Sequence, residues 1–360
     1  MEKIKLALLG CGDVAQRDYL PEFHRLADRA EIVAAAGRTE VRVRSVAEQY
    51  GIPAWYIDYE RMLHETEAEA VINLTPIQLH PETTLAALQA GKHVYSEKPV
   101  ASTVKDGQRI QAEARQRNLK LVCAPCVMLF PQVRYAQAVL AEGTIGEVYS
   151  ASGYGNLGVP PWSGYTSDPS PFFAKGGGPA LDMGVYPLHT FTGLLGPVKR
   201  VTAMVSKVLD RFTIKDGPLA GREVPVEVDD NWFMLLDFGG SRLASLAAND
   251  CVRATRAAMV ELHGLQGTIA LDPIDVSAPV DIFKPGAGWQ PTPPPFKGIA
   301  KEGRQAGPDH HLGVEHLVDC IQHDRTPVLS VDHAIHVVEI IEKAALSSAQ
   351  GQTLAMETTF

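Results

Sequence analysis

The chain has 360 residues, of which 45% are hydrophobic, and its formal net charge is −9 at pH 7. This length predicts two domains, and an acidic balance without a basic block argues against nucleic acid as a partner. No apolar run reaches the roughly 18 residues that a membrane-spanning helix needs. Five cysteines without a leader segment favour a reducing cytoplasm.

A strand, a glycine turn and a helix begin the chain, in residues 3–15 (KIKLALLGCGDVA). Gly10 allows a tight turn after the strand, Gly12 lets backbone N–H groups approach a phosphate, and the helix N-terminus supplies partial positive charge. Ala15 fills the third position of the pattern G-x-G-x-x-G/A, which requires only close helix–strand packing. The segment therefore predicts a site for a dinucleotide pyrophosphate, formed by Gly10, Cys11, Gly12, Asp13 and Val14.

The second predicted strand, residues 31–36, ends where a dinucleotide-binding fold selects its cofactor. An acidic residue there would bind the adenosine ribose hydroxyls, whereas an arginine would pair with a 2′-phosphate. Gly37 stands where the acid is expected, and Arg38 and Thr39 follow. This favours NADP, with NAD as the alternative. An ordinary surface role is the alternative for Arg38. Glu40, if turned inward, would bind the ribose hydroxyls and reverse the preference.

Helices and strands alternate further along the first third of the chain. Helices are expected at residues 41–50, from 58, at 81–90 and at 104–117, and strands at 54–56, 70–74, 92–95 and 119–122. This alternation predicts an α/β fold with a Rossmann-type, doubly wound parallel sheet over residues 1–124. Ligands of such sheets bind at the carboxyl ends of the strands. Thr75-Pro76 and Glu97-Lys98 both follow strands, so we expect them at the same edge as the glycine turn.

Thr75-Pro76-x-x-x-His80 followed by Glu97-Lys98-Pro99 resembles the glucose–fructose oxidoreductase / inositol dehydrogenase (Gfo/Idh/MocA) family. The resemblance covers nearly the whole chain, because the family's pattern continues in its second half. It implies that Lys98 approaches the oxygen of the reacting carbon and that the Lys98–Pro99 bond is cis. The residues around Lys98 that we expect at the cofactor are Thr75, Pro76, His80 and Glu97.

Cys123 and Cys126 form a C-x-x-C pair, the spacing of thioredoxin-type redox sites. The pair follows the last strand of a nucleotide-binding fold, so we favour coincidence over a redox function. Cys251 and Cys320 are isolated, and no zinc–thiolate site is expected. Cys11, between two glycines, is interpreted as a small filler under the turn, with a catalytic thiol as the alternative.

A long segment rich in proline, glycine and aromatic residues occupies positions 158–178. Such an irregular segment is typically a binding loop or a lid. The family resemblance implies that it covers the active site, with Trp162 against the nicotinamide or the substrate. Ordinary surface packing of Trp162 is the alternative.

The helix expected after Pro179 carries Asp182, Tyr186 and His189 on one face, at the spacing i, i+4 and i+7. A second stripe is apolar and predicts packing; it consists of Leu181, Val185 and Leu188. The polar stripe thus presents a carboxylate, a phenol and an imidazole together. A solvated helix face is the alternative.

The segment from Asp182 to Tyr186 resembles the family motif G-G-G-x-x-x-D-x-G-x-H/Y. Many members use a histidine at the last position as proton acceptor, and Tyr186 matches a subset that oxidises sugars and diols. The resemblance implies catalytic roles for Lys98, Asp182, Tyr186 and His189, with the acid/base open between Tyr186 and His189. The Lys98 ammonium would lower the pKa of Tyr186, ordinarily about 10. Asp182 would hold a substrate hydroxyl or orient Lys98, and His189 would contact a second hydroxyl or relay the proton.

The rest of the chain predicts an α+β domain over residues 125–360, built on a large, open, mostly antiparallel sheet. Strands are expected at 146–154, 198–207, 226–238, 242–249, 257–263 and 268–271, and helices at 131–142, 310–322 and 333–347. Residues 290–296 are proline-rich and predict a surface loop. Residues 231–238 (NWFMLLDF) place apolar side chains on both strand faces. This predicts a homodimer or homotetramer associated through the outer face of the sheet, as the resemblance also implies.

Five histidines near the C-terminus raise a metal hypothesis: His310, His311, His316, His333 and His336. His311 and His316 are five positions apart, so they do not share a helix face, and no carboxylate–histidine repeat accompanies them. Histidines that are solvated or lie at the edge of a cleft are the favoured interpretation, and no metal is expected.

Together these motifs predict an NAD(P)-dependent oxidoreductase. It would transfer a hydride between the nicotinamide and a secondary alcohol or ketone of a sugar, polyol or sugar derivative. One alternative is an NAD-assisted enzyme that cleaves glycosides by transient sugar oxidation, against which stoichiometric nicotinamide reduction would argue. The other is a non-catalytic cofactor-binding regulator, which would be free to lose Lys98, Asp182 and Tyr186.

Overall fold

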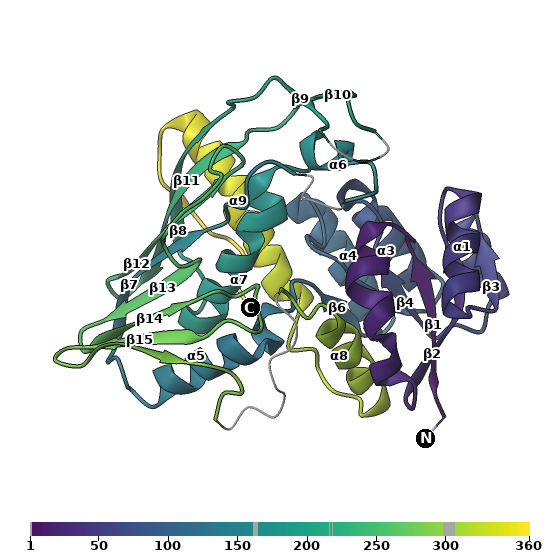
Figure 1. The fold of residues 1–360 in the computed structure, drawn as a ribbon, viewed down its shortest axis with the longest axis horizontal. Coiled ribbons are helices and arrows are strands. Elements are labelled where there is room, and N and C mark those ends of the chain that lie inside the picture. Colours follow the sequence, from purple (N-terminus) through teal and green to yellow (C-terminus); the bar gives the residue numbers. More distant parts are fainter. Residues whose placement is uncertain (1, 161–164, 216, 218, 298–306) are drawn as a thin grey trace. The chain divides into compact units, whose positions relative to one another are not determined.

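A computed structural model of the chain describes residues 2–160, 165–215, 217, 219–297 and 307–360. The chain divides into two compact units, drawn in Figure 1. Unit 1 comprises Met1–Pro125, Gly164–Pro171 and His310–Ile335, and unit 2 comprises Cys126–Ser163, Phe172–Asp309 and His336–Phe360. Each unit is therefore formed by three segments that are separate in the sequence.

Unit 1 contains a six-stranded sheet in the order β3-β2-β1-β4-β5-β6, with all neighbouring strands parallel. Its strands are β1 (Ile4–Leu9), β2 (Ala30–Ala36), β3 (Ala54–Tyr56), β4 (Ala70–Asn73), β5 (His93–Ser96) and β6 (Leu121–Cys123). This is the strand order of the doubly wound, Rossmann-type sheet. The predicted α/β class is confirmed.

The helices of unit 1 are α1 (Glu40–Tyr50), α2 (Tyr59–Glu65), α3 (His80–Gln89), α4 (Val104–Gln116), α8 (His311–Gln322), the start of α9 (Val331–Gln350) and the short helix η3 (Ile77–Leu79). Two of them, α2 and α4, begin after a residue whose side chain caps the helix. The Asp58 carboxylate accepts the N–H of Glu60 at 2.9 Å ahead of α2, and the Thr103 hydroxyl accepts the N–H of Asp106 at 3.1 Å ahead of α4. Such caps satisfy amides that have no partner within the helix.

The helical segment after the glycine turn is not a regular α-helix. A π-helical turn, η1 (Ala15–Tyr19), is closed by the N–H of Leu20 on the carbonyl of Ala15, and the 3-10 helix η2 (Leu20–Leu26) follows. Pro21 has no N–H, so α-helical hydrogen bonding cannot continue through it. At the end of η1, Tyr19 is turned into the interior, with 2% of its surface exposed.

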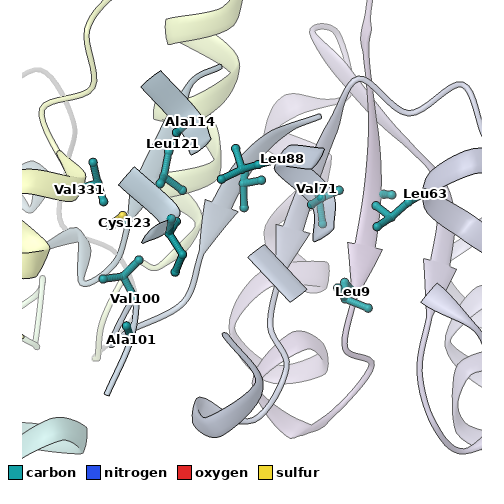
Figure 2. Close-up of a cluster of buried hydrophobic side chains, with 14 of the residues drawn as sticks. Leu9, Leu63, Val71, Leu88, Val100, Ala101, Ala114, Leu121, Cys123 and Val331 are labelled. Carbon is teal, nitrogen blue, oxygen red and sulfur yellow. The ribbon is translucent and has the colours of Figure 1, made fainter. Parts of the chain in front are cut away.

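One cluster of buried side chains forms the core of unit 1 (Figure 2). Leu9 and Val71 of the sheet pack with Leu63 of α2 and Leu88 of α3. Val331, at the start of α9, belongs to the same cluster, and α8 packs against β5 and β6. The sheet is therefore completed by residues from the far end of the chain, because a parallel sheet needs cover on both faces.

Unit 2 contains a nine-stranded sheet in the order β16-β15-β14-β13-β7-β12-β11-β8-β17. Its strands are β7 (Val148–Tyr154), β8 (Arg200–Ser206), β11 (Asn231–Gly239), β12 (Arg242–Asn249), β13 (Val260–Gly264), β14 (Gly267–Leu271), β15 (Val280–Lys284), β16 (Gly288–Thr292) and β17 (Leu354–Ala355). β7 and β12 pair in parallel and the other neighbours are antiparallel. The predicted open, mostly antiparallel sheet is confirmed.

Several short strands of unit 2 were not predicted from the sequence. They are β15, β16, β17 and a separate antiparallel pair, β9 (Arg211–Thr213) with β10 (Glu223–Pro225). The predicted surface loop at residues 290–296 is wrong in part, because β16 runs through Gly288–Thr292. Its Pro291 is tolerated because β16 is an edge strand, where a missing N–H need not break a ladder.

The other helices in the described part of the chain are α5 (Pro131–Ala141), α6 (Ser170–Phe173), α7 (Val185–Leu195), the π-helical turn η5 (Ala180–Gly184) and the 3-10 helix η4 (Cys126–Leu129). In unit 2, α5 and α7 pack on one face of the nine-stranded sheet (Figure 1). A Cβ on Gly153 of β7 would lie 2.7 Å from the ring of Phe191, so this glycine lets α7 approach the sheet. Among the described residues, no helix is both long and apolar enough to cross a membrane.

The opposite face of the nine-stranded sheet exposes large apolar side chains. Met204 of β8 is 80% exposed, Phe233 and Leu235 of β11 are 56% and 59% exposed, and Leu243 of β12 is 57% exposed. Phe233 is paired with Met204 across the β11–β8 ladder, so these side chains share a face. A contiguous apolar face of this kind is typical of a protein–protein interface.

We expect the protein to form homodimers or homotetramers through this face. Light scattering at micromolar concentration should give a mass above the 39.0 kDa of one chain. Leu235→Glu should shift that mass toward a single chain, because a charge on the buried interface would be desolvated. Val328→Glu, at a 57% exposed position of unit 1, is the matched control and should leave the mass unchanged. A monomeric wild-type protein would refute the prediction.

Candidate cofactor and catalytic site

The glycine turn lies where the strand order of the parallel sheet reverses, between β1 and β4. Gly10 directly follows β1 and has a φ of +102°, and a Cβ there would lie 2.4 Å from the carbonyl oxygen of Leu74. Only glycine combines this backbone conformation with this close approach. The crevice at such a switch point is the ligand site of doubly wound sheets. The structure thus places the predicted pyrophosphate turn in a suitable position.

Asp13, in the glycine turn, forms hydrogen bonds with Thr166 and Ser167, which are distant in the sequence. Its Oδ1 accepts hydrogen bonds from the N–H and hydroxyl of Thr166 at 3.1 and 3.0 Å, and its Oδ2 lies 2.8 Å from the Arg17 guanidinium. The Asp13 N–H donates to Oγ of Ser167 at 3.0 Å, and Arg42 donates to the same oxygen at 3.1 Å. The amide that the sequence assigns to a phosphate is therefore directed at an oxygen acceptor. Arg42 and Ser167 were not foreseen.

Cys11, Cys123 and Cys126 are buried. Cys11 is 4% exposed, and burial raises the pKa of its thiol to about 12, although the Arg42 charge lowers it. Burial also raises the pKa of the Cys123 thiol, and Cys126 is fully buried. Because the thiolate is the reactive form, these environments favour the filler interpretation of Cys11 and argue against a redox C-x-x-C.

Arg38 and Thr39 are exposed at the end of β2. Arg38 forms no hydrogen bond or ion pair with any residue that the structure describes. Thr39 is the N-cap residue of α1, but its side chain makes no capping hydrogen bond. Glu40 is the first residue of α1, which begins one position before the predicted start of this helix. A guanidinium and a hydroxyl are therefore available here to a ligand.

The loops after β4 and β5 are tied together by His80. Its Nδ1 lies 2.8 Å from the carbonyl oxygen of Pro99, and its Nε2 lies 2.7 Å from that of Thr75. Burial lowers the pKa of His80, while the Pro99 carbonyl and the Glu97 charge act in the opposite direction. Thr75 is also held by its hydroxyl, which donates to the Asn73 side chain at 2.8 Å. His80 thus braces the site, and its predicted contact with the cofactor stays a prediction.

Lys98 follows β5 at the same edge of the sheet and is half-buried. Its N–H donates to Oε2 of Glu97 at 2.8 Å, and the Lys98–Pro99 bond is cis, as the resemblance implied. Glu97 is only 7% exposed and its carboxylate points into unit 1. The roles of Lys98 and Glu97 toward ligands stay predictions, as do those of Pro76, Gly12 and Val14.

In unit 2, η5 and α7 carry the predicted acid/base residues. Asp182, Tyr186 and His189 are 7%, 4% and 5% exposed, so the alternative of a solvated face is wrong. The motif glycine Gly184 packs closely, since a Cβ on it would lie 3.2 Å from the Cβ of Ala248 in β12. η5 therefore packs closely against β12, and the side chains of Asp182, Tyr186 and His189 are buried within unit 2. Trp162 lies outside the described residues.

A carboxyl group that the sequence did not single out lies near Asp182. Asp250 directly follows β12 and is 7% exposed. Burial, together with the charges of Asp182 and Asp230, raises its pKa from 3.8 to about 8. Asp230 is fully buried and accepts the N–H groups of Val208 and Leu209 at 2.6 and 2.8 Å. The only feature of the sequence that could have indicated Asp250 is its position directly after a predicted strand.

Asp250→Asn should stabilise the protein at alkaline pH. Because the pKa of Asp250 is raised on folding, the folded state holds a proton that the unfolded state releases, so stability falls as pH rises from about 4 to about 8. One unit of pKa displacement corresponds to about 1.4 kcal/mol, so a gain of at least about 2 kcal/mol is expected near pH 9 and none near pH 4. Urea unfolding across this range measures it. Asp281→Asn, on β15, is the control, and equal pH dependence of wild type and Asp250→Asn would contradict the prediction.

Of the two favoured positions for the C-terminal histidines, solvated or at the edge of a cleft, the solvated one is wrong for four of them. His310, His311, His333 and His336 are all buried. His336 accepts the N–H of Val198 at 3.0 Å, and burial lowers its pKa to about 4. These histidines lie on or next to α8 and α9, and both helices are packed against the rest of their units. Helix faces that appear polar in the sequence are therefore buried. Within the described parts of the chain, no three metal-ligating side chains are grouped to hold an ion.

A parallel sheet of this order, with a glycine turn at its switch point, defines unit 1 as a dinucleotide-binding domain. Residues 4–124 match the model of an oxidoreductase family with an NAD-binding Rossmann fold, and residues 133–270 match the GFO/IDH/MocA C-terminal domain. The chain therefore belongs to the Gfo/Idh/MocA oxidoreductase family, as its motifs indicated.

Two relatives illustrate the range of similar sequences. The dTDP-3,4-didehydro-2,6-dideoxy-alpha-D-glucose 3-reductase of Streptomyces violaceoruber is 32% identical over 222 residues, which cover 61% of this chain and 61% of the relative. The match thus spans about three-fifths of that relative's length. The trans-1,2-dihydrobenzene-1,2-diol dehydrogenase of Sus scrofa is 27% identical over 338 residues, 89% of this chain and 90% of the relative. Both names agree with the predicted class of activity.

The fold has close counterparts among solved structures. Levoglucosan dehydrogenase, solved in complex with NADH and L-sorbose, superposes with a TM-score of 0.86 at 20% identity, covering 99% of this chain and all of that chain. At this identity the likeness concerns the fold alone.

Proposed function

We propose that the protein is an NAD(P)-dependent oxidoreductase acting on a secondary alcohol or ketone of a sugar, polyol or sugar derivative. One observation carries the proposal: the Gly10 turn, the Thr75 loop and the Lys98 loop meet at the carboxyl edge of one parallel sheet. The two relatives named above, a reductase of a dTDP-sugar and a dehydrogenase of a dihydrodiol, support this substrate class.

Unit 1 offers groups that fit such a cofactor. The positive φ and tight packing of Gly10 shape a turn whose amides can bind a pyrophosphate. Arg38, without a partner among the described residues, suits a 2′-phosphate, so we infer a preference for NADP. A bound nicotinamide would take the hydride from the alcohol carbon or return it to a ketone. Residues 1–124 would thus bind the cofactor, and residues 125–360 the substrate and other copies of the chain.

The chain's own residues would move the proton. Oxidation of an alcohol needs a base for the hydroxyl proton, and Tyr186 and His189 are the two candidates. Lys98 would supply positive charge to the oxygen of the reacting carbon, and Asp182 would hold a substrate hydroxyl. The burial of Asp182, Tyr186 and His189 supports these roles, because polar groups act more strongly where water is excluded.

A cytoplasmic location is part of the proposal. All five cysteines are free thiols, and Cys11, Cys123, Cys126 and Cys320 are buried. Free cysteines are typical of proteins kept in a reducing compartment.

Nicotinamide absorbance tests the proposed function. The protein is mixed with NADP or NAD and a panel of sugars, polyols and glycosides, and samples without sugar are the control. We expect one substrate class to reduce the nicotinamide stoichiometrically. Glycoside cleavage without net reduction would instead support the glycosidase alternative, and cofactor binding without any turnover would support a regulator.

A further inference from the structure

A buried polar cluster lies beneath Lys98, at the carboxyl end of β5. It is formed by Tyr19 of η1, Tyr95 of β5, Glu97 and His310, which precedes α8; their exposed fractions are 2%, 0%, 7% and 6%. The Tyr19 hydroxyl donates to Oε1 of Glu97 and lies 2.8 Å from the Tyr95 hydroxyl. The other carboxylate oxygen of Glu97 accepts the N–H of Lys98 at 2.8 Å. Two segments distant in sequence, those of Tyr19 and His310, thus converge on the residue before the predicted catalytic lysine.

The direction of each hydrogen bond follows from the groups present. Tyr19 has one O–H, which it gives to Glu97, so the Tyr95 hydroxyl must donate to Tyr19. The order is therefore Tyr95 to Tyr19 to Glu97, with the Lys98 N–H donating to the same carboxylate from the other side. His310 stacks on Tyr19 with ring centroids 5.9 Å apart and an interplanar angle of 16°, and its Nδ1 lies 4.0 Å from Oε1 of Glu97.

Glu97 is a buried carboxylate stabilised by this cluster. Burial acts to raise its pKa, but His310, Lys98 and the Tyr19 hydrogen bond together hold the pKa of Glu97 below its ordinary value. A buried charge is tolerated only where hydrogen bonds and opposite charges replace water. The side chain of Glu97 is therefore fixed, and through it the backbone at Lys98.

We propose that Tyr19 and His310 are positioning residues for Lys98, acting through Glu97. This inference deepens the proposed function and rests on it. Tyr19 belongs to the helical turn that follows the pyrophosphate turn, so one hydroxyl links the predicted cofactor site to the backbone of the catalytic lysine. Catalytic groups must be held within fractions of an ångström, and supporting hydrogen bonds provide this.

Tyr19→Phe is the decisive variant, because it removes one hydroxyl and keeps the ring. We expect kcat to fall about tenfold while the Kd of the cofactor changes by less than about twofold. Tyr59→Phe is the matched control: it also breaks a tyrosine–glutamate hydrogen bond of unit 1, to Glu82 at 3.0 Å, but away from Lys98. It should leave kcat unchanged. His310→Gln, which keeps a polar group, should lower kcat in the same direction as Tyr19→Phe.

A pH profile separates positioning from a merely structural role. The titratable groups around Glu97 in the described chain are Tyr19, Tyr95, His80, Lys98 and His310. Loss of the Tyr19 hydroxyl removes a hydrogen bond that favours the ionised form of Glu97, so the acidic limb of the kcat profile should move to higher pH. A Tyr19→Phe enzyme with lower thermal stability but wild-type kcat and profile would overturn the proposal.

The backbone amide of Lys98 gives a readout that needs no turnover. In a ¹⁵N-labelled protein, the Lys98 amide proton resonance should move in Tyr19→Phe and stay in place in Tyr59→Phe. If no sugar is oxidised but this resonance moves, the proposed function fails while the link from Tyr19 to Lys98 stands. An unchanged Lys98 resonance in Tyr19→Phe would overturn the link itself.

Discussion

Lys98→Ala is expected to lower kcat by about 100-fold or more while cofactor binding survives. The reason is the place of Lys98 at the carboxyl end of β5, with its backbone held by Glu97 and the next residue's carbonyl facing His80. Alanine would remove the positive charge proposed to act on the reacting oxygen and leave these backbone contacts intact. Steady-state kinetics with the best substrate of the panel, together with calorimetric titration of the cofactor, measure both quantities.

Lys92→Ala is the matched control for this experiment. Lys92 precedes the same strand, β5, at its amino end, away from the edge that carries the glycine turn. Its replacement should leave kcat close to the wild-type value. Lys98→Arg keeps the charge but changes its shape, and should recover part of the loss. A Lys98→Ala enzyme that turns over at near the wild-type rate would refute the proposed role.

Arg38→Ala is expected to erase most of the preference for NADP over NAD. Arg38 is exposed at the end of β2 and forms no ion pair with any residue that the structure describes. A charge-assisted contact with a 2′-phosphate is worth about 1.5–3 kcal/mol, or roughly a 10- to 100-fold difference in affinity. Calorimetric titration of the wild type and the variant with both cofactors measures this difference.

The neighbouring charges of α1 supply the control and the competing outcome. Arg44 is also exposed, but its guanidinium lies 2.8 Å from Glu48. Arg44→Ala should therefore leave the cofactor preference unchanged. Glu40, at the start of α1, is the residue that could reverse it by taking the ribose hydroxyls. Tighter binding of NAD by the wild type, lost in Glu40→Gln, would mean that Glu40 and not Arg38 selects the cofactor.

The sequence by itself determined the elements whose signals are local. β1 and α4 begin where the sequence predicted a strand and a helix, and the glycine turn follows β1 as predicted. These predictions succeed because the period of buried side chains, the N-cap and the need for a positive φ at Gly10 depend on a few neighbouring residues. The family motifs around Lys98 and Asp182 are local for the same reason.

Only the tertiary structure decided which polar groups are buried and what they contact. The sequence did not single out Tyr19, and it favoured a solvated or cleft-edge position for His310, yet both are buried against Glu97. Asp250 gave no pattern of its own, and its raised pKa arises from Asp182 and Asp230 as well as from burial. The physical reason is that desolvation and charge interactions depend on distance in space. In this chain those distances are set by segments that are far apart in sequence.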